Sequence, residues 1–146
     1  MIRKITPEDR DVFFVLTREF YASPAVLHDV PDRYHADVFE EMMRSDVYAG
    51  GYILEYEGNI AGYALTAKTY SHDCGGLALW LEELYIREPY RSHGLGSEFF
   101  AYIINSHPEV RRFRLEVEPD NVRAIALYKR QGFEPLDYYQ MVRDEK

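Results

Sequence analysis

Apolar residues recur along the chain with two periods, one near 3.6 residues and one of two residues, which predict helices and strands respectively. An apolar stripe at helical spacing begins after Thr6 and runs to about Tyr21. Thr6 suits an N-cap, with Pro7 at the first helical position and Asp9 where a capping box places an acidic side chain. The pattern therefore predicts a first helix over residues 6–21.

The other elements follow from the same periods and from Gly, Pro and Asn at their ends. Strands are predicted at residues 2–5, 47–56, 60–70, 77–87 and 111–117, with one or two more within 133–143. Helices are predicted at residues 31–45 and 94–106 and from residue 119 onward, with Gly132 in the left-handed position that ends the last one. This order indicates a mixed α/β fold with helices packed on one central sheet, and residues 1–146 are expected to form a single domain.

The junction between the strand at 77–87 and the helix at 94–106 carries the clearest chemical signal. It contains Arg91, Gly94 and Gly96, and the two glycines lack Cβ atoms where backbone N–H groups must face outward. Unpaired N–H groups and the partial positive charge of a helix N-terminus form a cradle for an anion such as a phosphate. A tight turn without a ligand is the alternative interpretation of a bare Gly-x-Gly.

Two common phosphate-binding motifs are excluded at this junction. A P-loop requires Gly-Lys-Ser/Thr, whereas Ser97-Glu98 follows Gly96. A dinucleotide fingerprint requires a third small residue three positions after Gly96, where Phe99 stands. The pattern Arg-x-x-Gly-x-Gly after an apolar strand resembles instead the pyrophosphate loop of the GCN5-related N-acetyltransferase (GNAT) family, which binds acetyl-CoA there.

A second segment carries the same resemblance. Asn121, Ala124, Tyr128 and the pair Gly132-Phe133 are similar in identity and spacing to the later helix of that family. The resemblance is strong over residues 77–134 and weak before residue 60. Two motifs in the right order, about thirty residues apart, are far more specific than either one alone.

The resemblance implies a particular sheet and a cofactor site. Residues 81–86, Leu-Glu-Glu-Leu-Tyr-Ile, are most similar to the diamine and polyamine acetyltransferase branch. Central parallel strands near 81–87 and 111–117 would splay apart, and acetyl-CoA would enter the split as a pseudo-strand. The implied cofactor-binding residues are Leu84, Tyr85 and Ile86 for the pantetheine arm, Arg91, Ser92, His93, Gly94, Leu95, Gly96 and Ser97 for the pyrophosphate, and Asn121 and Tyr128 facing the split. For His93, an exposed turn residue is the preferred interpretation.

Tyr128 and Glu82 are the candidates for acid–base catalysis. Tyr128 lies seven residues after Asn121, so both fall on nearly the same helix face. Its phenol holds a proton at neutral pH that can go to the departing CoA thiolate, and an ordinary core aromatic is the alternative. Glu82 and Glu83 would face opposite sides of a regular strand, although a bulge would alter that parity. By resemblance to the polyamine branch, Glu82 is the candidate base or substrate anchor.

The composition of the chain limits the compartment and the partners that we expect for it. The single cysteine, Cys74, excludes an internal disulfide and suits a reducing cytoplasm. No apolar run approaches the ~20 residues of a membrane span, and no signal peptide is visible. The net charge of −8 argues against nucleic acid as a partner and suits a cationic amine. His72 and Cys74 are too few ligands for a metal, so no metal is expected.

Three functions stay open. The first is an acetyl-CoA-dependent N-acetyltransferase that moves an acetyl group to a small cationic amine, such as a polyamine or diamine, by direct transfer in a ternary complex. The second is an acetyltransferase for protein N-termini or lysines. The third is a non-catalytic acyl-CoA sensor, against which Tyr128 counts. Glu19, Asp29 and Asp32 are candidates to hold a second ammonium group, and a homodimer is left open.

Overall fold

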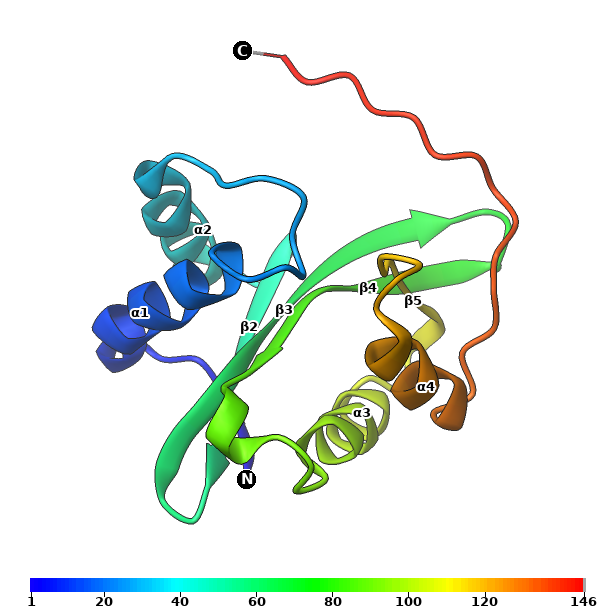
Figure 1. Cartoon of the computed structure of the whole chain (residues 1–146). Helices are drawn as coiled ribbons and strands as arrows, with labels where there is room; N and C mark the ends of the chain where they lie inside the picture. Colours follow the sequence, from blue (N-terminus) through cyan, green and yellow to red (C-terminus); the bar gives the residue numbers. More distant parts are fainter. Residues whose placement is uncertain (146) are drawn as a thin grey trace.

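Five strands form one mixed sheet in the computed structural model, which describes residues 1–145 (Figure 1). They are β1 (Ile2–Lys4), β2 (Ala49–Tyr56), β3 (Asn59–Ser71), β4 (Gly76–Ile86) and β5 (Val110–Leu115). Their order across the sheet follows the chain, and the first three pairings are antiparallel. β4 and β5 are parallel, which requires the crossover that α3 (Leu95–Ser106) supplies.

Helices cover both faces of this sheet (Figure 1). α1 (Arg10–Tyr21) and α2 (Asp32–Arg44) lie on one face, and α3 and α4 (Val122–Arg130) lie on the other. Each pair buries its own apolar core against the sheet. The first core contains Phe13, Leu16, Phe20, Phe39, Ile53 and Tyr63, and the second contains Leu54, Leu79, Leu81, Phe99, Phe100 and Ile103. The predicted α/β sheet with helices on both faces is confirmed.

The two parallel strands separate part-way along their length. β4 pairs with β5 only as far as Leu81, which lies opposite Leu115. β4 then continues to Ile86 on β3 alone, so its other edge carries backbone groups without a strand partner. The predicted split between the central strands is therefore present, and it begins where Glu82 follows Leu81.

The start of α1 follows the predicted capping pattern. Thr6 and Asp9 form a capping box, and a short 3-10 turn over Pro7–Asp9 leads into the helix. Arg3 of β1 holds the same carboxylate, with Nη1 2.8 Å and Nη2 2.9 Å from the two Asp9 oxygens. These hydrogen bonds lower the pKa of Asp9, against the effect of burial. The capping residue Asp9 thus also links β1 to the start of α1 through Arg3.

The end of the chain differs from the prediction. The structure assigns no strand within residues 133–143, although one or two were expected there. Pro135 removes a backbone donor, and Tyr139 and Met141 are 94% and 88% exposed. An alternating pattern forms a strand only where a neighbouring strand accepts its hydrogen bonds, and this segment pairs with none in residues 1–145.

The helices are short. α2, with 13 residues, is the longest of those that the described part of the chain contains. None of them combines the length and the apolar character that a bilayer crossing requires.

Candidate active site

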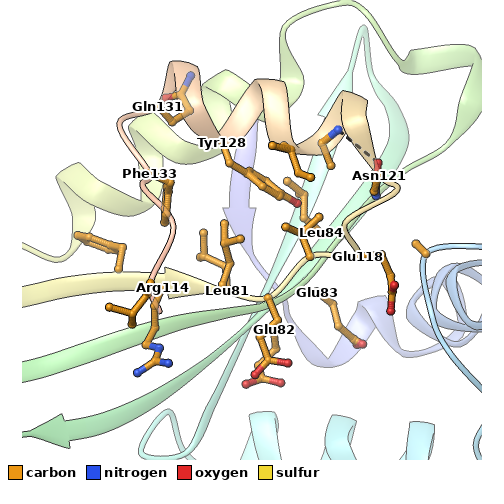
Figure 2. A pocket seen from close by; sticks show the side chains of 18 of the residues that line it. Leu81, Glu82, Glu83, Leu84, Arg114, Glu118, Asn121, Tyr128, Gln131 and Phe133 are labelled. Atoms are coloured by element: carbon orange, nitrogen blue, oxygen red, sulfur yellow. Dashed lines mark hydrogen bonds between the residues drawn. The ribbon is translucent and has the colours of Figure 1, made fainter. Parts of the chain in front are cut away.

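A groove of about 1230 Å³ runs along the split between β4 and β5 and beneath α4 (Figure 2). Its floor is formed by Leu81, Glu82, Glu83 and Leu84 of β4. Its other walls come from α4, from the segment that follows β5, and from Phe20 and Tyr21 at the end of α1. Three distant parts of the chain therefore meet at one point of the sheet.

A β-bulge decides which way the β4 carboxylates point. The pairing of β3 with β4 skips one residue, Glu82. Before the skip, Leu79 and Leu81 pack into the core beneath α3. After it, Glu83 contacts Tyr63, which belongs to the core beneath α1. Without the extra residue, Glu83 would share the face of Leu79 and Leu81 and would point into apolar surroundings.

Glu83 is the more enclosed of the two adjacent carboxylates. The hydroxyl of Tyr63 donates to its Oε1 at 3.2 Å. Burial raises the pKa of Glu83 to about 7, although hydrogen bonds from Tyr63 and Tyr21 oppose the rise. Glu83 is thus a carboxyl whose charge changes near neutral pH, as an acid–base group requires.

Glu82 is more exposed and lies in the groove itself (Figure 2). Partial burial raises its pKa, and the negative charge of Glu116 adds to the rise. Glu116 and Glu118 follow β5 and line the same groove, as Glu134 does, so five carboxylates line it together with the cations Arg112, Arg114 and Lys129. Sequence reasoning missed Glu116 and Glu118 because it extended the strand to residue 117, and acids at alternate positions beyond Leu115 were the available signal.

Tyr128 enters the groove from α4, and its ring extends toward Leu84 of β4 (Figure 2). The ring is 5.8 Å from that of Phe100 and 6.2 Å from that of Phe133, both at steep angles. Burial raises the pKa of Tyr128, so the phenol keeps its proton at neutral pH. The apolar packing anchors the ring, while the hydroxyl faces the groove that Glu82 also lines.

Asn121 begins the same helix. Its Oδ1 accepts a hydrogen bond from the backbone N–H of Ala124 at 3.3 Å, so the side chain acts as the N-cap of α4 (Figure 2). Asn121 also lines the groove. The spacing that suggested a shared face with Tyr128 is therefore present, and a capping role for Asn121 accompanies it.

The turn before α3 has the geometry of an anion cradle. Ser92 and Gly94 both have positive φ, 64° and 81°, and α3 begins directly afterwards at Leu95. The first N–H groups of such a helix have no partner within it. Arg91 lies beside the turn, and its Nε donates to the carbonyl of Ile86 at 2.8 Å, which leaves its terminal nitrogens for another acceptor.

Gly96 has a packing role that the sequence did not predict. It is buried, and a Cβ at this position would lie 2.8 Å from Cδ2 of Leu127. The missing side chain therefore lets α4 pack closely on α3. Because Tyr128 follows Leu127 on α4, this contact also helps to set the height of Tyr128 above the sheet.

α4 adds a second cation to the turn. Nη2 of Arg123 donates to Oγ of Ser92 at 2.7 Å, and Nε2 of Gln131 donates to Oγ of Ser97 at 3.2 Å. Two guanidinium groups, Arg91 and Arg123, thus flank the same turn. Sequence reasoning missed Arg123 because about thirty residues separate it from the motif, and its place two residues after the Asn cap was the only local signal.

The position of His93 agrees with the interpretation of an exposed turn residue. Its ring is 4.7 Å from that of Tyr56, and the residue is exposed. Cys74 lies in the turn between β3 and β4, where its thiol contacts the carbonyls of Ser71 and Gly76. Across residues 1–145, no three His, Cys, Asp or Glu side chains are grouped as metal ligands.

The three acidic residues proposed to bind the second ammonium group of an acceptor, Glu19, Asp29 and Asp32, differ in how far the fold already engages them. Glu19 accepts hydrogen bonds from two nitrogens of Arg87, both at 2.9 Å, and the pKa of Glu19 is lowered by them. Asp32 is 3.2 Å from Nε of Arg18. Asp29 accepts only a backbone hydrogen bond, from the following residue. Glu19 is therefore engaged in the fold, and Asp29 is the better candidate.

Comparison with known proteins agrees with this geometry. The model of the acetyltransferase (GNAT) family matches residues 12–133. The chain belongs to the GNAT acetyltransferase family. The predicted family is confirmed.

The relatives of this GNAT protein, and the solved structures similar to it, include acetyltransferases with different acceptors. It is 33% identical over 86 residues to a spermine/spermidine N(1)-acetyltransferase of Bacillus subtilis, a match that spans 56% of this chain and 57% of that protein. A candidate ribosomal protein bS18-alanine N-acetyltransferase of the same organism is 25% identical over 92% of this chain and 80% of its own length. The aminoglycoside N-acetyltransferase AAC(6')-Iy, solved with a CoA bisubstrate analogue, superposes with a TM-score of 0.81 at 18% identity over 100% of this chain and 98% of that one.

Proposed function

We propose that this GNAT protein transfers the acetyl group of acetyl-CoA to a primary amine of a small cationic molecule, such as a polyamine or diamine. The observation that carries the proposal is the excess of carboxylates in the groove that Tyr128 lines: Glu82, Glu83, Glu116, Glu118 and Glu134 are present there with three cations, Arg112, Arg114 and Lys129. This excess favours a ligand with more than one positive charge. The spermine/spermidine acetyltransferase among the relatives supports the same class of acceptor.

The chain's own features fit acetyl-CoA. Beyond Leu81, the open edge of β4 offers backbone groups to the amide-bearing pantetheine arm, as a sheet edge does to an added strand. The turn at Ser92 and Gly94, with Arg91 and Arg123 beside it, suits the pyrophosphate. When bound, acetyl-CoA supplies an acetyl group activated as a thioester.

The acidic residues solve the main chemical problem of an amine acceptor. A primary amine with a pKa of ~10.4 is mostly protonated at pH 7, a gap of ~3.4 units or ~4.6 kcal/mol. Glu82 holds the ammonium in the groove, and Glu83 accepts its proton as the general base. Tyr128 protonates the sulfur of the departing CoA, whose thiol pKa resembles the ~8.5 of cysteine.

The second candidate function is acetylation of protein N-termini or lysines. It is favoured by the ribosomal-alanine relative, which matches a larger part of this chain than the polyamine enzyme does. An N-terminal ammonium also fits an acidic groove. The acyl-CoA sensor is the weakest candidate, because a sensor needs neither a base at Glu83 nor an acid at Tyr128.

Thiol release in the presence of acetyl-CoA tests the proposal directly. Purified protein is incubated with spermine, spermidine, putrescine, an aminoglycoside, free amino acids and short peptides. We expect the highest kcat/KM with an acceptor that carries two or more amines. Acetylation of peptides alone would select the second candidate, and CoA binding without turnover on any acceptor would select the sensor. We further propose that the chain forms one domain, because both apolar cores lie against the same sheet.

A further inference from the structure

A line of four polar side chains leads from the groove into the body of the protein. Tyr63 Oη lies 3.2 Å from Oε1 of Glu83 and 3.4 Å from Oγ1 of Thr17. Thr17 Oγ1 lies 3.1 Å from Nδ1 of His35. Tyr63, Thr17 and His35 are 0%, 1% and 4% exposed, so all three are removed from bulk water. They come from β3, α1 and α2, and only the fold brings them into one line.

The number of protons on this line allows two complete arrangements. When Glu83 is a carboxylate, Tyr63 donates to it, Thr17 donates to Tyr63, and the Nδ1–H of His35 donates to Thr17. When Glu83 is protonated, every bond reverses, and Thr17 donates to a bare Nδ1 of His35. Each hydroxyl has a single proton, so the direction chosen at Glu83 dictates the direction at His35.

Both ends of the line border a second, smaller cavity. This cavity of about 170 Å³ lies between α1 and α2, and Glu83 lines it as well as Thr17, Tyr21, Tyr34 and His35. Tyr34 is 47% exposed, so the cavity lies close to the surface. Its other walls are apolar, and a space of this size can hold water where its polar side chains supply hydrogen bonds.

We propose that Glu83, Tyr63, Thr17 and His35 form a proton relay that carries the proton of the acceptor amine away from the groove to the cavity between α1 and α2. The relay rests on the proposed function, since the amine supplies the proton. Glu83 is the catalytic residue at its start, and Tyr63, Thr17 and His35 act through it.

The proton count of one turnover closes. The ammonium N–H bond breaks and its proton bonds to Glu83, which leaves a neutral amine to attack the acetyl carbon. Before the transfer the line passes to its second arrangement: the hydroxyl protons of Tyr63 and Thr17 rotate, and His35 takes a proton on Nε2 from water and loses the one on Nδ1 to water. Glu83 then gives its proton to Tyr63, Tyr63 gives its own to Thr17, and Thr17 gives its own to the bare Nδ1 of His35. The resulting imidazolium loses the proton on Nε2 to water in the small cavity, which leaves the line in its first arrangement.

Other ionisable groups around Glu83 set the pH range of the relay. Tyr21 of α1 hydrogen-bonds to it, Glu82 precedes it on β4, and Asp29 lies near Tyr21. Burial disfavours a negative charge on Glu83, and the charge of Glu82 acts in the same direction, with a resulting pKa of about 7. Below this pKa the carboxyl is protonated and cannot take the amine proton, so turnover rises with pH through about 7 in the intact protein.

A threonine series tests the relay by kinetics. Thr17→Val keeps the side-chain volume and removes the central hydroxyl, whereas Thr17→Ser keeps the hydroxyl. Thr66→Val is the matched control, because Thr66 is also buried and its hydroxyl bonds to the carbonyl of Gly50 and to Tyr52, neither of which belongs to the line. We expect Thr17→Val to lower kcat by about 10-fold at pH 7, less than the ~10²–10⁴-fold loss of a direct acid–base group. The loss should shrink toward pH 9.5, and Thr17→Ser should stay within about twofold of wild type.

A pH-independent loss in Thr17→Val, or an equal loss in Thr66→Val, would reduce the line to packing and overturn the relay. A wild-type kcat in Thr17→Val would also overturn it, because Glu83 lines the small cavity and would then give its proton directly to water there. Absence of turnover in the wild-type protein is a different result, since it overturns the proposed function. A measurement without turnover covers that case. Nitrogen-15 NMR of His35 at pH 8.5 should show the Nδ1–H tautomer in wild type and a shift toward Nε2–H in Tyr63→Phe. The same tautomer in both proteins would contradict the coupling of Glu83 to His35.

Discussion

The proposed cofactor end, which is the turn before α3, and the proposed acceptor end, which is the groove beside β4, are built in opposite ways. The turn at residues 91–97 offers backbone N–H groups from one contiguous segment, with the charges of Arg91 and Arg123 added at its rim. The acceptor end offers side chains from β3, β4, α1 and the segment after β5, and its central carboxylate reaches its place only through the bulge at Glu82. A constant ligand can be bound by a local backbone motif, whereas discrimination among amines depends on side chains that the whole fold assembles.

Tyr128 stands between these two ends, so its loss should have the largest effect. Tyr128→Phe keeps the ring that packs on Phe100 and Phe133 and removes only the acidic proton. We expect turnover to fall by about 10²-fold or more, with little change in CoA affinity. Steady-state kinetics at saturating acceptor and calorimetry with CoA measure the two quantities. Tyr139→Phe, on an exposed residue, is the control. Unchanged turnover in Tyr128→Phe would reduce this residue to packing.

The next largest effects should distinguish the two adjacent carboxylates, Glu82 and Glu83, by their kinetics. Glu83→Gln removes the proposed base and should lower kcat by about 10²-fold at pH 7, with a smaller loss at pH 9.5, where more of the amine is already neutral. Glu82→Gln should act mainly on KM of a cationic acceptor, because Glu82 is the proposed anchor and is exposed in the groove. A larger pH-dependent loss in Glu82→Gln than in Glu83→Gln would return the base to Glu82, the assignment that the family resemblance first indicated.

The pH dependence of stability gives an independent measure of the raised pKa of Glu83. The folded-state pKa of Glu83 is raised to about 7, above the unfolded value of ~4.3. The native protein therefore binds this proton more tightly than the unfolded chain, and the associated stability is present below about pH 4 and lost as pH rises through about 7. Glu83→Gln should thus have a melting temperature above that of wild type at pH 8 and closer to it at pH 4. Thermal unfolding at the two pH values checks this sign.

Substitutions at the proposed cofactor end should change only the affinity for CoA. Arg91→Gln and Arg123→Gln each remove one full charge beside the turn, which corresponds to about 1–2 kcal/mol and roughly 5- to 30-fold in the Kd of CoA. Turnover at saturating acetyl-CoA should stay near wild type, because neither residue lines the groove at the thioester end. Arg91→Lys tests whether charge alone suffices. A wild-type Kd in both glutamine variants would place the pyrophosphate elsewhere.

The same contrast explains what could be predicted from the sequence. The strand, turn and helix around Gly94 are contiguous, so their order was predictable within one or two residues, and the split beside β5 followed from the family resemblance. The network at Glu83 was not predictable, because Tyr63 lies on the neighbouring strand and Thr17 on α1, and neither belongs to a motif.

The errors have physical reasons as well. The strands expected within residues 133–143 rested on alternation alone, and alternation does not say whether a partner edge exists. Glu116 and Glu118 were passed over because a strand was extended to residue 117, whereas β5 ends at Leu115 and leaves both acids beside the split. The sequence allowed the prediction that a bulge would change the faces to which Glu82 and Glu83 point. Its position at Glu82, however, depends on how β3 pairs with β4.

The smallest effect on activity should come from the start of α1, which is local in sequence like the cofactor turn and contributes no group to the groove. Asp9→Asn keeps a side chain that can accept from the N–H of Thr6 and removes the charge that Arg3 holds through two nitrogens. We expect a loss of about 1–2 kcal/mol of stability, or roughly 3–6 °C in melting temperature, with turnover unchanged.

The pH dependence of this loss has a definite sign. The pKa of Asp9 in the folded protein lies below its unfolded value of ~3.9, chiefly because of the hydrogen bonds from Arg3. The stability that it contributes is therefore fully present above about pH 5 and disappears as pH falls through the folded pKa. The difference in melting temperature between Asp9→Asn and wild type should be constant from pH 5 to 8 and should vanish in strong acid. A difference that survives there would come from packing rather than from charge, and a change in kcat would show that the first helix is coupled to the chemistry at Glu83.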